Sequence, residues 1–75
     1  MKYHIGQKVW IWRGDKEKPY RAEIKDCLGK SSSGDYVYEF KAYHETYTCD
    51  SGCAEYDIYE SEQTAQKAYQ NWLSN

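Results

Sequence analysis

The sequence predicts one small domain, mainly β with one C-terminal helix, in which four to five antiparallel strands curl into a small barrel. Three observations predict this fold. Polar and apolar residues alternate along four segments before residue 61, as they do in half-buried strands. After residue 61 the period changes to about 3.6 residues, as in an amphipathic helix. The connections are short, and a sheet this small has to bury one face by curling, with the helix closing an opening.

The composition favours a core of aromatic side chains. Only nine of the 75 residues are Val, Ile, Leu or Phe, or about 12%. This fraction is below the roughly 20% under which disorder becomes common. Disordered chains also carry a large net charge, whereas this chain carries −2. Nine Tyr, three Trp and one Phe are present, and each aromatic side chain buries about 150–250 Å². We therefore expect residues 1–75 to fold as a single domain.

The first strand is expected over residues 7–13, whose centre consists only of β-branched and aromatic residues. In a strand, successive side chains point to opposite faces. This alternation places Val9 and Ile11 on one face and Trp10 and Trp12 on the other.

A loop of charged and turn-forming residues follows at 13–19, and the second strand is expected over residues 19–28. Asp26 and Cys27 break the alternation of this strand, which predicts a bulge or bend near them. Residues 29–35 are rich in Gly and Ser and predict a flexible loop. One face of the second strand carries apolar side chains: Tyr20, Ala22 and Ile24.

The third and fourth strands are expected over residues 35–49 and 53–60. The segment Asp50-Ser51-Gly52 separates them and has its glycine where a type I turn with a bulge requires one. Such a turn places Cys49 opposite Cys53. The same register predicts two further cross-strand pairs: Tyr43 with Tyr59, and Tyr47 with Glu55.

The C-terminal helix is expected over residues 61–74. Ser61 is a good N-cap residue, and Glu62 lies in the first turn, where the helix dipole favours an acidic side chain. Apolar residues then recur with helical spacing and form one stripe: Ala65, Ala68, Tyr69, Trp72 and Leu73.

The sequence shows no recognisable membrane or secretory segment. No apolar run approaches the roughly 20 residues of a membrane-spanning helix, and the N-terminus leads into no signal-peptide core. Three cysteines are too few for a disulfide scaffold, and their number is odd. We therefore expect a cytoplasmic protein with no membrane partner.

The charge is unevenly distributed along the chain. Residues 1–30 carry a net charge of +4 and residues 31–75 carry −6. This asymmetry predicts either a basic and an acidic face or two halves that attract each other. The small total charge argues against a general binder of polyanions.

Both ends of the chain resemble known small proteins. The segment Tyr3 to Trp10 resembles the hydrophobic-Gly-x-x-Val-Trp start of SH3-like and Tudor-like barrels. The segment Ile58 to Ala68 is similar to the closing strand and helix of short proteins encoded by bacteriophages and prophages. The resemblance implies a small SH3/Tudor-like barrel and a mobile-element origin, and therefore the cytoplasm of a bacterial host cell.

The cysteines allow three interpretations. A tetrahedral zinc site would need Cys27, Cys49, Cys53 and either His44 or His4, but the spacing fits no usual zinc knuckle. A cross-strand disulfide between Cys49 and Cys53 is geometrically allowed. Free thiols are the interpretation that we favour, with no metal and no cofactor.

An enzymatic role is not expected. Nucleophilic catalysis needs a base next to the nucleophile and a group that orients the base. The two histidines lie in no recognisable motif, and a domain of this size has little depth for a dry pocket. We therefore expect a non-enzymatic protein.

Aromatic and basic residues lie together near the first loop. Stacking surfaces beside positive charge hold single-stranded nucleic acid in small barrels, and aromatic cages hold methylated ammonium groups. The alternative is that the helix stripe covers one or both tryptophans, which then belong to the core. The residues concerned are Trp10, Trp12, Arg13, Lys16, Lys18 and Arg21.

The acidic half provides a second candidate surface. Acidic side chains in this half could imitate a phosphate backbone, although true mimics carry far more charge than −2. Tyrosines beside such acids suit a protein interface, because Tyr contributes a large contact area at low entropic cost. These tyrosines are Tyr43, Tyr47 and Tyr59.

The sequence therefore predicts a non-enzymatic protein-binding module, encoded by a phage or other mobile element, that binds a bacterial host protein. Inhibition of a defence nuclease fits this setting. The alternative is a small barrel that binds single-stranded nucleic acid. We expect a monomer or a weak homodimer formed through an unpaired edge strand. The predicted binding residues are Trp10, Trp12, Arg13, Lys16, Lys18, Tyr43, Tyr47 and Tyr59.

Overall fold

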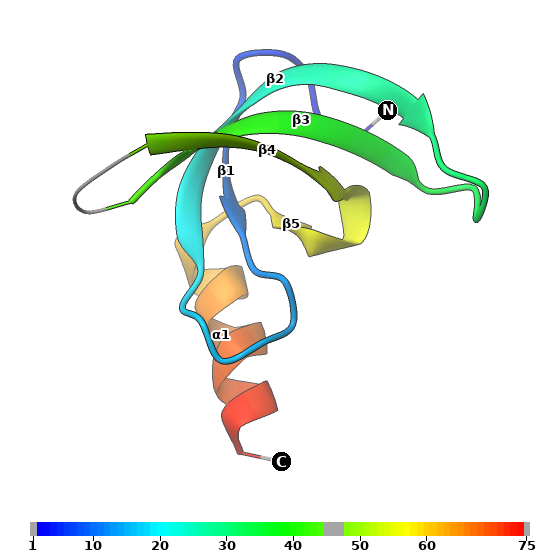
Figure 1. The fold of residues 1–75 in the computed structure, drawn as a ribbon. Helices are drawn as coiled ribbons and strands as arrows, with labels where there is room; N and C mark the ends of the chain where they lie inside the picture. Colours follow the sequence, from blue (N-terminus) through cyan, green and yellow to red (C-terminus); the bar gives the residue numbers. More distant parts are fainter. Residues whose placement is uncertain (1, 45–47, 75) are drawn as a thin grey trace.

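The computed structural model describes residues 2–44 and 48–74, which form one five-stranded antiparallel sheet and one C-terminal α-helix (Figure 1). This architecture confirms the prediction of a mainly β protein with a single helix at its end. Successive strands are neighbours except the last, which returns to pair with the first, so the spatial order is β4-β3-β2-β1-β5. The elements are β1 (Lys8–Ile11), β2 (Tyr20–Lys30), β3 (Tyr36–Tyr43), β4 (Thr48–Ala54), the 3-10 turn η1 (Glu55–Asp57), β5 (Ile58–Tyr59) and α1 (Glu62–Leu73).

The sheet does not close into a barrel, so this part of the prediction is wrong. Strands β2, β3 and β4 arch over β1 and β5, but the two edge strands, β4 and β5, do not pair (Figure 1). Closure needs continuous strand pairing around the ring. Here η1 separates β4 from β5, and β5 has only two residues, both paired with β1. The open sheet leaves the seven-residue β4 as an edge, through which the weak homodimer is predicted to form.

The turn predicted at Asp50-Ser51-Gly52 is also wrong. These residues lie inside β4, opposite residues 41, 40 and 39 of β3. Strand β3 ends at Tyr43, which pairs with Thr48 and not with Tyr59. The alternation along β4 places Cys53 opposite Tyr38 in the core, and this burial outweighs the local turn signal. The predicted pairing of Tyr47 with Glu55 lies outside the described residues.

The same strand geometry excludes the Cys49–Cys53 disulfide, which is the alternative to the favoured free thiols. Cys49 and Cys53 are four positions apart on one extended strand, so their Cα atoms are separated by about 13 Å. A disulfide requires less than about 7 Å. Cys27, Cys49 and Cys53 are all free thiols.

The bulge predicted near Asp26 and Cys27 is confirmed. The β2–β3 register shifts between Ile24 and Asp26 and again between Cys27 and Gly29. Gly29 has a φ of 97°, a conformation that side-chain-bearing residues rarely adopt. The two irregularities bend the far half of this long hairpin, which extends away from the rest of the sheet (Figure 1).

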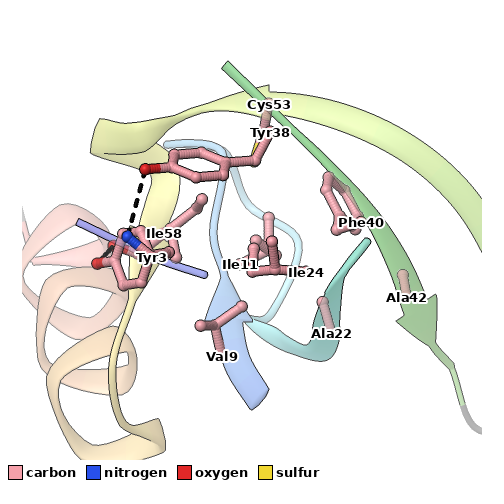
Figure 2. Close-up of a cluster of buried hydrophobic side chains, with 10 residues drawn as sticks. All are labelled: Tyr3, Val9, Ile11, Ala22, Ile24, Tyr38, Phe40, Ala42, Cys53 and Ile58. Carbon is pink, nitrogen blue, oxygen red and sulfur yellow. Dashed lines mark hydrogen bonds between the residues drawn. The ribbon is translucent and has the colours of Figure 1, made fainter. Parts of the chain in front are cut away.

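The hydrophobic core lies on the concave side of the sheet (Figure 2). Alternate residues of β1 point into it, as predicted: Val9 and Ile11 are almost fully buried. Three aromatic rings enlarge this core, in keeping with the composition. Ten buried residues form the cluster: Tyr3, Val9, Ile11, Ala22, Ile24, Tyr38, Phe40, Ala42, Cys53 and Ile58.

Helix α1 begins as predicted. The Ser61 hydroxyl accepts a hydrogen bond from the Thr64 N–H at 3.2 Å and thereby caps the helix. Ala65 and Tyr69 of the apolar stripe are buried, whereas Trp72 remains 41% exposed. The N-terminal part of the stripe is therefore packed against β1 and β5, whereas its C-terminal end stays partly exposed.

The helix packs on the side of β1 and β5 that faces away from the core. Trp12 is the centre of this packing, with its ring centroid 6.1–6.5 Å from those of Tyr59, Tyr69 and Trp72. We call these four residues the helix cluster. Backbone carbonyls of the β1–β2 loop hold it further: Asp15 accepts from the Trp12 indole N–H at 2.9 Å, and Lys16 accepts from the Tyr69 hydroxyl at 3.0 Å.

Candidate functional site

A cross-strand row of four residues runs over the outer face of the sheet. Tyr43 of β3 lies opposite Arg21 of β2, Arg21 lies opposite Trp10 of β1, and Trp10 lies opposite Tyr59 of β5. Directly opposed residues of antiparallel strands share a face and have Cβ atoms about 4.5–5.5 Å apart. The register therefore places one cation between a tryptophan and a tyrosine.

Two adjoining hollows share three of these residues, namely Trp10, Arg21 and Tyr43. We call this surface the outer groove. One hollow, of about 610 Å³, extends towards Lys18 and the end of the β1–β2 loop. The other, of about 540 Å³, extends towards Glu60 after β5. Trp10 and Tyr43 are half-buried, and Arg21 is exposed. The groove thus combines two flat aromatic walls with an accessible cation.

Two hydrogen-bond donors of the outer groove remain available. Within residues 2–44 and 48–74, no hydrogen bond engages the Trp10 indole N–H, and no hydrogen bond or ion pair engages the Arg21 guanidinium. Arg presents several donors in a planar fork that matches a carboxylate. The groove can therefore receive an anionic acceptor beside the aromatic rings of Trp10 and Tyr43.

The lysines next to the groove on the same face are paired with a carboxylate. Lys8 and Lys25 both form ion pairs with Glu23, the latter at 2.9 Å. Hydrogen bonds from Lys8 and then from Lys25 lower the pKa of Glu23 to about 2. The Tyr43 hydroxyl also donates to Glu23 at 3.4 Å. Since both lysines are occupied by Glu23, Arg21 is the central cation of the groove, and Lys18 lies at the end of the groove next to the β1–β2 loop.

The predicted binding residues separate into different parts of the molecule. Trp10, Tyr43 and Lys18 line the outer groove. Trp12 is only 8% exposed and belongs to the helix cluster, which is the core-filling alternative for this residue. Tyr59 lies in the row but packs on Trp12, and burial raises its pKa.

Arg13 points away from the groove. Its guanidinium reaches the edge strand β4, where it donates to Ser51 Oγ at 3.2 Å and to the Gly52 carbonyl at 2.9 Å. It also lies 5.7 Å from the centre of the Phe40 ring. A hydrogen bond with Tyr20 raises the pKa of Arg13 further. Arg13 thus links the β1–β2 loop to the edge strand β4.

The remaining predicted residues do not join the groove. Lys16 is exposed and takes part in packing only through its backbone carbonyl. Tyr47 lies outside the described residues. The sequence placed Arg21 on the polar face of its strand but did not indicate that it would lie between Trp10 and Tyr43, because that juxtaposition depends on the pairing of three strands.

The described cysteines and histidines do not form a metal centre. Within residues 2–44 and 48–74, no group of three or more His, Cys, Asp or Glu side chains is arranged to hold a metal ion. Cys53 lies in the core, Cys27 on the extended hairpin, and Cys49 at the opposite end of the sheet from Cys27. The described part of the chain also contains no helix that is long and apolar enough to cross a membrane.

Comparison of the chain with protein-family models, with curated proteins and with solved structures finds no match in any of the three.

Proposed function

We propose that the protein is a non-enzymatic binding module that docks another protein in the outer groove, through Trp10, Arg21 and Tyr43. The observation that carries this proposal is the row in which Arg21 pairs with Trp10 on one side and with Tyr43 on the other, both half-buried. Arg21 is exposed, and within residues 2–44 and 48–74 its guanidinium makes no hydrogen bond or ion pair. Trp, Tyr and Arg are the residue types that dominate the binding energy of protein interfaces. Their rigid rings lose little conformational freedom when a partner covers them.

The partner surface that fits this groove presents an acidic side chain next to apolar ones. The carboxylate pairs with Arg21, and apolar groups cover the rings of Trp10 and Tyr43. Such a charge-assisted bidentate bond adds orientation as well as binding energy. Following the resemblance of the chain ends to phage-encoded proteins, we extend the proposal to a bacterial host protein as the partner, with inhibition of a defence nuclease as the outcome that fits this setting.

Single-stranded nucleic acid is the competing ligand. Stacking on Trp10 and Tyr43 beside Arg21 would suit bases and phosphates. Carboxylates at both ends of the groove, from Glu17 and Glu60, oppose a phosphate backbone that continues beyond the central cation. A protein partner with a single acidic anchor avoids this repulsion, and for this reason we favour it.

The test is capture from a bacterial lysate, with and without nuclease treatment, by four forms of the tagged protein: wild type, Trp10→Ala, Arg21→Ala and Lys67→Ala. Lys67 is exposed on α1 and serves as the matched control. We expect a protein that binds wild type and Lys67→Ala but neither groove variant, with at least about a tenfold loss of affinity for each when the purified partner is titrated.

Two results would count against the proposal. Capture that is equal for wild type and both groove variants would place the binding surface elsewhere. Capture that disappears on nuclease treatment would indicate a nucleic acid, and the logarithm of its affinity should then fall linearly with the logarithm of salt concentration.

A further inference from the structure

The thiol of Cys49 and the imidazole of His44 lie next to each other at the edge of the sheet formed by β4. The Sγ atom of Cys49 lies 3.5 Å from Nε2 of His44, within hydrogen-bond distance for sulfur. Cys49 is the second residue of β4 and pairs with Ala42, and His44 directly follows β3. The centroid of the Tyr20 ring lies 4.9 Å from that of the His44 ring. The imidazole thus contacts both Tyr20 and the thiol.

This pair opens onto a hollow of about 300 Å³. Both side chains are half-buried, so a small molecule can reach the sulfur while much of its surroundings remains protein. The rest of the lining is polar and aromatic, and its charged members are the cations Arg13 and Lys18 and the carboxylates Asp15 and Glu17.

We propose that Cys49 is a reactive thiol that forms mixed disulfides with small disulfide compounds, and that His44 is the group that activates it. The thiolate is the nucleophilic form of cysteine, and a neighbouring imidazole is one of the groups that generate it. His44 takes the thiol proton, and the Cys49 sulfur attacks one sulfur of the small disulfide. The old S–S bond breaks, and the released thiolate takes the proton from His44 and leaves as a thiol.

The other two cysteines lack this arrangement. Cys53 is only 5% exposed in the core, and burial raises its pKa to about 12. Cys27 is half-buried on the extended hairpin, and its thiol has no hydrogen bond among residues 2–44 and 48–74. The chain therefore contains two internal controls for the reactivity of Cys49.

The hollow beside Cys49 adjoins the outer groove, because Lys18, Tyr20 and His44 line both this hollow and the larger hollow of the groove. A group attached to Cys49 would lie beside a partner bound at Trp10 and Arg21.

The experiment is timed modification of the reduced 75-residue chain by oxidised glutathione and, separately, by 5,5′-dithiobis(2-nitrobenzoic acid), at neutral pH. The reaction is stopped with acid, and the free thiols are blocked with N-ethylmaleimide. Digestion on the N-terminal side of aspartate cuts before Asp26 and Asp50, so that Cys27, Cys49 and Cys53 fall in three different peptides. Mass spectrometry then gives a separate rate for each cysteine.

We expect Cys49 to react at least tenfold faster than Cys27 and Cys53 to remain unmodified in the folded protein. In His44→Gln the rate of Cys49 should fall to that of Cys27, while His4→Gln should leave it unchanged. In guanidinium the three rates should converge, because the difference arises from the fold.

If His44→Gln does not fold, the rates of Cys49 and Cys27 in the folded wild-type protein still test the proposal. A Cys49 rate no higher than that of Cys27 in wild type would overturn the proposal. A folded His44→Gln variant with an unchanged Cys49 rate would overturn the role of His44.

Discussion

The hydroxyl of Tyr38 accepts a hydrogen bond from the backbone N–H of Tyr3 at 3.3 Å, and the two rings meet edge to face with centroids 5.7 Å apart (Figure 2). Tyr3 donates in turn from its own hydroxyl to the Ile58 carbonyl at 3.0 Å. One tyrosine before the first strand thereby connects β3 with β5 on two sides of the core. The N-terminal segment is consequently part of the fold and not an appendage to it.

The first prediction concerns this connection. Replacing Tyr3 by Phe keeps the ring but leaves the buried Ile58 carbonyl without its partner, which lowers the free energy of unfolding by about 1–2 kcal/mol. Urea unfolding followed by far-UV circular dichroism measures the loss. Tyr36→Phe is the matched control, because Tyr36 is half-buried and its change should stay within about 0.5 kcal/mol. Equal losses for the two variants would contradict the role assigned to the Tyr3 hydroxyl.

The second prediction concerns alkaline pH. Burial raises the pKa of Tyr3 from 10.0 to about 12, and burial also raises the pKa of Tyr38. Because the folded state favours the protonated phenol, the stabilisation is complete below about pH 10 and is lost as the pH rises towards 12. We expect the urea midpoint to fall across this range, and to fall less steeply in Tyr3→Phe. The difference in absorbance at 295 nm between wild type and Tyr3→Phe should isolate Tyr3 from the other eight tyrosines and show that it ionises well above pH 10.

The third prediction compares the contributions to stability of Trp10, in β1, and Trp12, which directly follows β1. Trp12→Ala empties the centre of the helix cluster and should cost about 3–5 kcal/mol. Trp10→Ala removes a half-buried side chain from the outer groove and should cost about 1 kcal/mol. Urea unfolding with detection at 222 nm compares them. A similar loss for both variants would mean that Trp10 is structural and that the groove variant is unsuitable for binding tests.

The fourth prediction uses two glycines of the sheet. Gly29 has a φ of 97°, so that Gly29→Ala forces a side chain into a strained conformation and should cost about 1–2 kcal/mol. Gly52 has no such angle, and a Cβ atom there would meet the Tyr38 carbonyl at an ordinary 3.5 Å. Gly52→Ala should therefore change the free energy of unfolding by less than about 0.5 kcal/mol. Chemical denaturation of the two variants decides whether the bulge depends on glycine.

The fifth prediction concerns Glu23 at acid pH. Its pKa is lowered from 4.5 to about 2 by hydrogen bonds from Lys8 and Lys25. The ion pairs therefore persist as the pH falls through 4.5 and are lost only towards 2. NMR titration of the Glu23 side-chain carboxyl should show this value, and either Lys8→Ala or Lys25→Ala should raise it. High salt should raise it too, because exposed charges are screened.

Local patterns were sufficient to predict much of the secondary structure. The alternation around Val9 and Ile11, the loss of alternation at Asp26 and the cap at Ser61 each depend on neighbours within a few residues. Such features are set by backbone geometry and by which side chains share a face. The structure confirms all three.

Long-range pairing explains what sequence patterns did not predict. The Asp50-Ser51-Gly52 segment has the residues of a turn, but its position in β4 is decided by the burial of Cys53 opposite Tyr38. The outer groove likewise depends on the register of three strands, and Trp12 could be separated from Trp10 only by knowing which of them the helix covers. Closure of the sheet would require the two edge strands, β4 and β5, to pair with each other, and a local sequence pattern does not determine such a pairing.

Strand β1 separates two packed layers with only four residues. Val9 and Ile11 belong to the core on one side, and Trp12, directly after the strand, joins the helix cluster on the other. Strand β5 divides in the same way, with Ile58 in the core and Tyr59 in the helix cluster. We therefore expect the helix cluster to open while the ten-residue core stays intact. Amide hydrogen exchange should accordingly show two levels of protection, with α1 opening by a local fluctuation and the amides of β1 exchanging only when the whole molecule unfolds.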